Sequence, residues 1–248
     1  MPRFVLAPLT FFLLGLLAGC GSINTPIEIP AGEQVEGSLR SVNGALRIGS
    51  EARVTGNLSN VNGPIEVGPG ALVGSITNVN GLIELQAGAE AGPTESVNGA
   101  VALAPQTVIR GGISAVNGSI EIAEDSRVEG DVQTVNGRVS LKPNVAVQGK
   151  VANVRGRIEL DGASAGAIET TVGSIDLTGS TVVTGLLWVR AAQDGDNHVP
   201  RIVIGPGVRV TGPLRFDREV ELLVHDTAEV GEIIGAEPQC FSCEITDL

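Results

Sequence analysis

The residues best suited to catalysis or metal binding are few in this chain. There are two histidines, His198 and His225, and His198 lies in a polar stretch with Asp194 and Asp196. Such a group could ligate a metal ion, or supply acid and base groups for polysaccharide cleavage. However, no aspartate-rich loop here is completed by a glutamate at calcium-site spacing. We therefore expect a polar loop at this place and predict no metal, no cofactor and no catalytic residue.

Acidic side chains recur at a second set of positions, one in most repeats of 17 to 19 residues. Stacked carboxylates would either repel one another or gather divalent cations. We favour a solvated face that keeps the protein soluble, and cation binding is the alternative. The row contains Glu66, Glu84, Glu121, Glu159 and Asp176, with Arg47, Ala102 and Ser140 at equivalent places.

The first twenty residues combine a positive start, an apolar run and a cysteine. Residues 4–19 carry no charge, and Leu17-Ala18-Gly19-Cys20 resembles the bacterial lipobox. The run is shorter than a typical membrane-spanning helix and fits a signal peptide. We predict a signal peptide over residues 1–19 and lipidation of Cys20, whose acyl chains would anchor the protein in a membrane. Gly21 follows, where an aspartate would suggest inner-membrane retention, so we expect the outer membrane.

The other two cysteines, Cys240 and Cys243, lie in a Cys-x-x-Cys pattern near the C-terminus. This spacing is typical of redox motifs in cytosolic proteins with a βαβ pattern, whereas the lipobox predicts export to an oxidising compartment. A two-cysteine metal site would lack further ligands. We therefore predict a local disulfide between Cys240 and Cys243.

Composition excludes some classes of function. The 248 residues carry a formal net charge of -12 at pH 7, whereas nucleic-acid binders carry basic patches, so we predict no nucleic-acid partner. Tyrosine is absent and aromatic residues make up 2% of the chain. The core must therefore close around Val, Ile, Leu, Ala and Gly, which suits a narrow interior built from many similar layers.

An internal repeat organises the chain. Each copy of Val-Asn-Gly is followed by two apolar residues in alternation, such as Leu46 and Ile48, as expected of a strand with one buried face. A second glycine lies about halfway through each repeat. Two degenerate copies of the motif follow six regular ones, whose asparagines are Asn43, Asn62, Asn80, Asn98, Asn117 and Asn136.

Short strands at this spacing leave no room for crossover helices. They predict an all-β fold, a single-stranded parallel β-helix of about 10 coils with 18–19 residues per coil. Because coils stack about 4.8 Å apart, equivalent residues would lie above one another, and the asparagines would form a hydrogen-bonded ladder. The sequence leaves open whether their amides point inward or outward.

The repeat also predicts the limits of the solenoid. We expect it to cover residues 35–235, with one inserted loop at 191–200. Residues 20–34 would be the lipidated N-terminus and a linker, and 236–248 a C-terminal tail. Three late aromatic residues, Trp188, Phe216 and Phe241, would plug the C-terminal end of the rod, where exposed strand edges invite stacking.

Coils that read Val-Asn-Gly-x-Ile-x-Ile and then x-Gly-x-Val resemble two bacterial families over roughly residues 35–235. One is the bactofilin group of polymer-forming β-helices, and the other is a group of adhesin-like β-solenoids. The resemblance implies a right-handed coil and, for bactofilins, end-to-end polymerisation in the cytosol. The export signal departs from the bactofilin pattern. Neither family brings catalytic residues to this chain.

These features together predict a non-enzymatic, lipid-anchored scaffold or adhesin-like binding protein of the cell envelope. Its expected partners are the membrane, through the lipid, and an envelope polysaccharide or protein. Self-assembly into polymers is the alternative. A polysaccharide-processing β-helix enzyme is less favoured, because near-constant coil length leaves one loop, at 191–200, from which to build a cleft.

Overall fold

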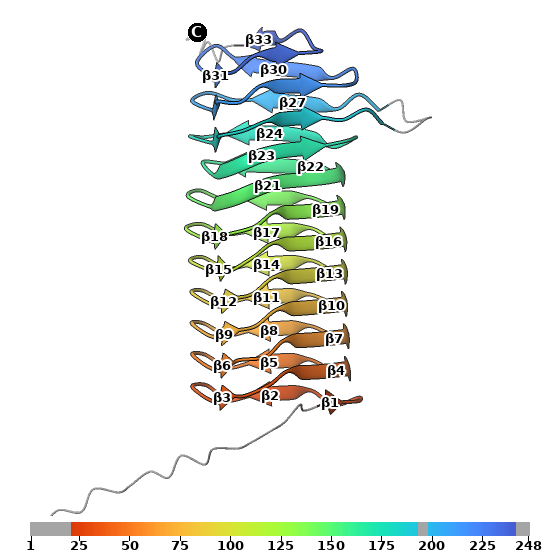
Figure 1. The fold of residues 1–248 in the computed structure, drawn as a ribbon, viewed down its shortest axis with the longest axis vertical. Helices are drawn as coiled ribbons and strands as arrows, with labels where there is room; N and C mark the ends of the chain where they lie inside the picture. Colours follow the sequence, from red (N-terminus) through yellow and green to blue (C-terminus); the bar gives the residue numbers. More distant parts are fainter. Residues whose placement is uncertain (1–20, 193–197, 242–248) are drawn as a thin grey trace, which may run out of the picture.

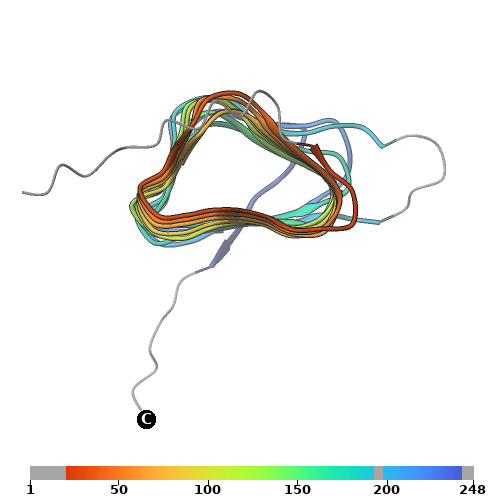
Figure 2. The same ribbon diagram turned by 90° about the horizontal axis from the view of Figure 1, so that it is seen from below.

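The computed structural model describes residues 21–192 and 198–241. This part of the chain is a β-solenoid of about 11 turns and contains no helix. Figure 1 shows the coils stacked from β1 to β33, and the view along the axis shows a cross-section like a rounded triangle (Figure 2). The prediction of an all-β parallel solenoid is confirmed.

One wall of the triangle is a twelve-stranded parallel sheet. Its strands are short, and in the regular coils they carry the two apolar residues that follow Val-Asn-Gly. They are β2 (Ile27–Ile29), β5 (Leu46–Ile48), β8 (Ile65–Val67), β11 (Ile83–Leu85), β14 (Val101–Leu103), β17 (Ile120–Ile122), β20 (Val139–Leu141), β22 (Arg157–Asp161), β24 (Ser174–Thr178), β27 (Arg201–Ile204), β30 (Glu221–His225) and β33 (Gln239–Phe241).

The other two walls belong to one twenty-one-stranded sheet. The wall that leads into Val-Asn-Gly, here called the long wall, contains β1 (Gly21–Ser22), β4 (Leu39–Asn43), β7 (Leu58–Asn62), β10 (Ile76–Asn80), β13 (Thr94–Asn98), β16 (Ile113–Asn117), β19 (Val132–Asn136), β21 (Ala146–Arg155), β23 (Ser164–Thr170), β26 (Leu187–Val189), β29 (Leu214–Phe216) and β32 (Ile233–Ile234).

The third wall is the short wall, which is made of two-residue strands, and β21 and β23 run through it into the long wall. Its remaining strands are β3 (Gln34–Val35), β6 (Arg53–Val54), β9 (Leu72–Val73), β12 (Glu90–Ala91), β15 (Val108–Ile109), β18 (Arg127–Val128), β25 (Val182–Val183), β28 (Arg209–Val210) and β31 (Glu229–Val230).

Register is kept from coil to coil, so that equivalent residues face each other. On the long wall Asn80 pairs with Asn62 on one side and with Asn98 on the other. On the twelve-stranded sheet Ile83 pairs with Ile65 and Val101 in the same way. The hydrophobic alternation of the sequence therefore turns the same face inward in every coil.

The core is a narrow aliphatic column. Leu46, Ile65 and Ile83 are fully buried, and Phe216 is the one aromatic side chain among the buried hydrophobic residues that the structure describes. Glycine keeps the corners thin. A Cβ at Gly56 would lie 2.2 Å from the backbone carbon of Gly37 in the coil before. The scarcity of aromatic residues thus follows from closely spaced walls.

The prediction of a linker over residues 20–34 is wrong, because the solenoid begins before residue 35. Gly21 and Ser22 already pair with Arg40 and Ser41, and Ile27 to Ile29 pair with Leu46 to Ile48. The alternation of Ile27 and Ile29 matches that of later strands, but no Val-Asn-Gly precedes it. This first coil explains why the rod has about 11 turns instead of about 10.

The expected C-terminal boundary is also wrong by one strand. Gln239 to Phe241 of the predicted tail form β33, which pairs with Leu223 to His225. The predicted loop at 191–200 lies between β26 and β27, and its residues 193–197 are outside the described part.

Candidate functional site

The six asparagines of the repeat lie in one row on the outside of the corner between the long wall and the twelve-stranded sheet. Each Nδ2 donates a hydrogen bond to the Oδ1 of the asparagine one coil nearer the N-terminus, over 2.8–3.0 Å within the row. All six residues are exposed, which settles the direction that the sequence left open. Each amide retains a second N–H and further lone-pair capacity for a partner.

The asparagine row has one member that the sequence did not reveal. Asn24 accepts a hydrogen bond from Asn43 over 2.7 Å, although Asn24 is followed by threonine instead of glycine. At the other end Arg155 pairs with Asn136 and takes the asparagine position. The row therefore begins in the first coil and ends where the sequence predicted.

The glycines after these asparagines fix the corner. The amide of Gly99 donates to the carbonyl of Asn117, and that of Gly118 donates to the carbonyl of Asn136. A Cβ at Gly99 would lie 2.0 Å from the carbonyl oxygen of Gly81. No side chain fits between the coils at this point, so the corner of each coil sits directly on the previous one.

Valines precede the asparagines and form a second exposed row. Four of them, Val61, Val97, Val116 and Val135, are between 36 and 41% exposed, and Val154, which precedes Arg155, is 44% exposed. Chain direction changes here, so that the valine and the asparagine of one coil both point outward. We call this double row the Val–Asn corner; it runs from Val42 and Asn43 to Val135 and Asn136 and ends beside Val154.

A buried polar row lies behind the Val–Asn corner, one residue before most of the valines, and it was not among the expected features. Asn60 Nδ2 donates to the carbonyls of Gly44 and Gly63, and Thr134 Oγ1 donates to the carbonyl of Gly118. The signal was present, because a small residue, usually Ser, Thr or Asn, precedes Val in every copy. The row consists of Ser41, Asn60, Asn78, Ser96, Thr134, Asn153 and Thr170.

The buried row is not fully satisfied. Among the described residues, Ser41 Oγ, Asn60 Oδ1, Asn78 Oδ1 and Asn153 Nδ2 have no protein hydrogen-bond partner. Unpaired buried polar atoms cost free energy, so bonds to the glycine carbonyls must offset that cost if the corner is to stay rigid.

A shallow groove of about 380 Å³ adjoins the Val–Asn corner on the long wall. Val116, Val135 and Val154 line one side, and the small Ala152 lies between them and the charged side. There Glu169 accepts contacts from two cations, Lys150 at 3.2 Å and Arg190 at 2.8 Å. The groove thus offers apolar contact beside fixed charges.

Trp188 lies next to this groove, on the outside of the long wall between Glu169 and Arg215. The Arg190 guanidinium carbon lies 4.3 Å from the centre of the indole ring, and that of Arg215 lies 5.3 Å away. Trp188 Nε1 donates to Asp217 over 2.8 Å. Hydrogen bonds from Arg215 and then Trp188 lower the pKa of Asp217 below its ordinary value.

The expectation that Trp188 plugs the C-terminal end is therefore wrong, because its position in β26 points outward. Phe216 is buried in the core, and Phe241 in the last strand packs edge-on against His225 at 5.2 Å between ring centres.

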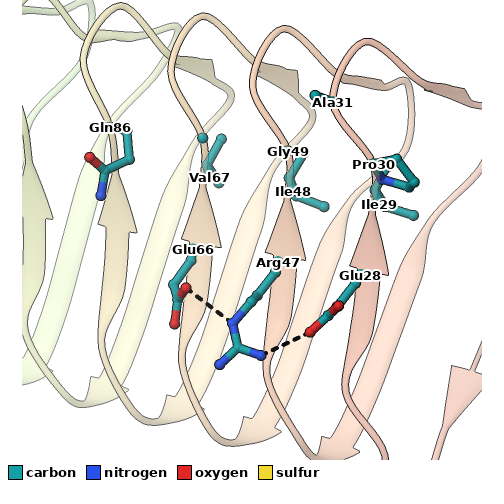
Figure 3. A pocket seen from close by; sticks show the side chains of 11 residues that line it. Glu28, Ile29, Pro30, Ala31, Arg47, Ile48, Gly49, Glu66, Val67 and Gln86 are labelled. Carbon is teal, nitrogen blue, oxygen red and sulfur yellow. Dashed lines mark hydrogen bonds and ion pairs between the residues drawn. The ribbon is translucent and has the colours of Figure 1, made fainter.

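The acidic row lies on the outside of the twelve-stranded sheet. Near its N-terminal end, Arg47 bridges Glu28 at 3.1 Å and Glu66 at 3.2 Å, beside a hollow of about 430 Å³ (Figure 3). The hydrogen bond that Arg47 donates to Glu28, followed by the charge of Glu66, raises the pKa of Arg47. Further along, Arg157 contacts Glu159 at 3.6 Å and Asp176 at 3.4 Å. Arginines thus form ion pairs with the carboxylates near both ends of the row.

The remaining candidates do not meet in one place. His198 flanks the loop whose Asp194 and Asp196 lie outside the described residues, and its carbonyl accepts from Arg218. His225 is buried in β30, with Nδ1 2.9 Å from Asp226. Within 21–192 and 198–241, no three His, Cys, Asp or Glu residues are grouped as metal ligands.

The predicted covalent sites involve residues beyond the described ranges. Cys240 lies exposed in β33, whereas its predicted partner Cys243 and the lipidation site Cys20 are outside the described residues. The disulfide and the lipid therefore stay predictions. Along the described chain, no helix has the length and apolarity needed to span a membrane.

The Val–Asn corner with its groove offers hydrogen bonding and apolar contact at one-coil intervals. No family model, no curated protein and no solved structure matches this chain.

Proposed function

We propose that this protein is a non-enzymatic, lipid-anchored component of the bacterial cell envelope, located in the outer membrane, whose solenoid is a rigid binding scaffold of the adhesin type. The lipobox before Cys20 supports the anchor. The uniform coils support a scaffold, because they place the same chemical groups at fixed intervals along a rod.

The observation that carries the binding role is the Val–Asn corner. An exposed row of branched apolar side chains is unfavourable in water, and extended apolar surface commonly marks an interaction site. Here each valine stands beside an amide that keeps hydrogen-bonding capacity after the ladder bonds are made. A ligand that repeats apolar and hydroxyl groups along its length would match both rows.

An envelope polysaccharide is the ligand class that fits best. Sugar rings present C–H faces to apolar side chains and hydroxyl groups to amides. The neighbouring groove would hold one part of the chain, with Ala152 leaving room beside Val135 and Val154. Several weak contacts along one rod would add up through multivalency.

Binding should depend on the corner and not on the outer face of the twelve-stranded sheet. We expect the paired substitutions Val116→Lys and Val135→Lys to weaken binding to polysaccharide fractions of the parent bacterium at least tenfold, measured by calorimetry. The matched control places Glu84→Lys and Ala102→Lys on the twelve-stranded sheet and should leave affinity within twofold. Equal affinity of the corner variant and the wild type would refute the assignment.

The lipid anchor has its own test. Cys20→Ala should abolish labelling by a radioactive fatty acid and move the protein from the membrane fraction to the soluble fraction. Retention in the membrane fraction without labelling would contradict lipidation at Cys20.

End-to-end self-assembly is the alternative function, and the open ends of the solenoid favour it. Within the described residues β2 pairs with β5 alone, and β33 pairs with β30 alone, so backbone groups at both ends lack strand partners. Electron microscopy of detergent-free protein separates the two functions. Filaments would support assembly, and single rods of uniform length would exclude it.

A further inference from the structure

We propose that the first coil of the solenoid, residues 21–38, is a membrane seat: it rests in the headgroup layer of the bilayer and holds the rod upright. The inference rests on the proposed lipidation of Cys20 and adds where the folded chain meets the lipid. Three observations carry it.

The first observation is the absence of a linker between the anchor and the fold. Gly21 is already paired with Arg40, and Ser22 with Ser41. Cys20 is bonded directly to Gly21, so their Cα atoms are about 3.8 Å apart. Acyl chains on Cys20 would therefore bring the first coil to the membrane surface.

The second observation is an exposed apolar side chain beside the anchor. Ile23 is 73% exposed, whereas the next most exposed large hydrophobic residue in the described chain, Ile234, is 45% exposed. Ile23 follows β1 directly and lies three residues after Cys20. Insertion among the lipid tails near the headgroups would remove this side chain from water, in addition to the burial of the acyl chains.

The third observation determines how deep the first coil lies in the bilayer. Strands β2 and β3 pair only with β5 and β6, so one backbone edge of the first coil has no strand partner among the described residues. Such groups are satisfied by hydrated headgroups but are costly in hydrocarbon. The coil also carries Glu28, Glu33 and Glu36. The seat therefore lies in the headgroup layer and prefers zwitterionic lipids to anionic ones.

An upright rod places the binding surface at a defined height. The groove beside Val116, Val135 and Val154 lies five to seven coils above β1, about 25–35 Å from the membrane at 4.8 Å per coil. Trp188 lies about 45 Å away by the same spacing.

Tryptophan quenching in vesicles tests the seat. The full-length protein is produced with its signal peptide, purified in lipidated form and reconstituted into phosphatidylcholine vesicles that contain brominated lipid. The wild type, with Trp188 as its single tryptophan, should lose less than about a tenth of its emission. The Ile23→Trp variant should lose about half, since one of its two tryptophans would sit at the interface. The matched variant Ile234→Trp, at the far end, should behave like the wild type.

Two results would overturn the seat while the anchor stands: vesicle-bound Ile23→Trp without additional quenching, or strong quenching of Trp188 in the wild type, which would indicate a rod that lies flat. Failure of the lipidated preparation to float with vesicles would refute the anchor of the proposed function. Insertion of ten Gly and Ser residues after Cys20 should preserve flotation and reduce the quenching of Ile23→Trp by more than half. Unchanged quenching in that insertion variant would also overturn a seat set by the short connection.

Discussion

Each asparagine of the exposed row acts as donor to the coil before it and as acceptor from the coil after it. Asn98, for example, donates to Asn80 and accepts from Asn117, both over 3.0 Å. The side-chain amides thus repeat the hydrogen-bonding pattern of the backbone on the outside of the rod. Because these bonds are exposed, each contributes at the lower end of the usual range.

Removal of one amide should weaken the rod measurably. Asn98→Ala breaks two ladder bonds, and we expect a loss of about 1–2 kcal/mol in the free energy of unfolding, measured by urea denaturation. Thr77→Ala is the matched control, since Thr77 is exposed on the same wall and has no side-chain hydrogen bond in the described contacts. Equal stability of the two variants would show that the ladder adds nothing.

A second residue-scale prediction concerns backbone conformation at the corner between the twelve-stranded sheet and the short wall. Gln106 has φ 63°, whereas Gly70 and Gly88 occupy the equivalent place with φ 65° and 70°. A left-handed conformation costs a residue other than glycine about 1–2 kcal/mol. Glycine offsets part of this gain, because the greater freedom of the unfolded chain lowers stability by about 0.4–1 kcal/mol.

Gln106→Gly should therefore stabilise the protein by about 0.5–1 kcal/mol and raise the thermal unfolding midpoint. Gln133→Gly, in the extended strand β19, should destabilise it by a similar amount. A lower midpoint for Gln106→Gly would contradict the assigned backbone conformation.

Sequence patterns predicted some residue positions and not others. The asparagine row was predictable because Val-Asn-Gly repeats with few errors, whereas Asn24 lacks the following glycine. The outward direction of the amides was not predictable, since it depends on the change of chain direction at the corner. The outward position of Trp188 is set by its register with Glu169 and Arg215. The degenerate late repeats hide this register in the sequence.

At the scale of elements, coil stacking depends on close backbone contact at the corners. Strand identity follows from alternation, as in β5 and β8, and the sequence predicted it well. The ends of the solenoid were harder to predict, because terminal coils lack a neighbour on one side and need less of the repeat. Thus the sequence predicts a linker where β1 and β2 lie and a tail where β33 lies, although all three strands pair in register with their neighbours.

Glycine substitution tests the stacking directly. A Cβ at Gly99 would lie 2.0 Å from the carbonyl oxygen of Gly81, whereas at Gly92 the nearest atom would be 3.1 Å away. Gly99 does not have a left-handed φ, so the effect of Gly99→Ala is steric. We expect Gly99→Ala to cost about 3 kcal/mol and Gly92→Ala about 1 kcal/mol in urea unfolding. Similar costs for both would contradict the contact between adjacent corners.

At the scale of the whole molecule, the structure joins a rigid rod to a predicted anchor without an intervening linker. An anchor at the first coil opposes end-to-end stacking there, because acyl chains would occupy the space of the next rod. The same geometry leaves the Val–Asn corner exposed along the side. A rod that presents a repeating surface at a fixed height suits a repeating polymer as its ligand.

The dependence of affinity on ligand length tests this account most directly. Size-fractionated envelope polysaccharide would be titrated into the lipidated protein by calorimetry, and the length of the recovered chains would be measured afterwards. The account predicts that affinity increases with chain length until the ligand spans about 25 Å, the length of the Val–Asn corner, and that the chains are recovered intact. Saturation at a single disaccharide, shortened chains, or no binding at any length would contradict it.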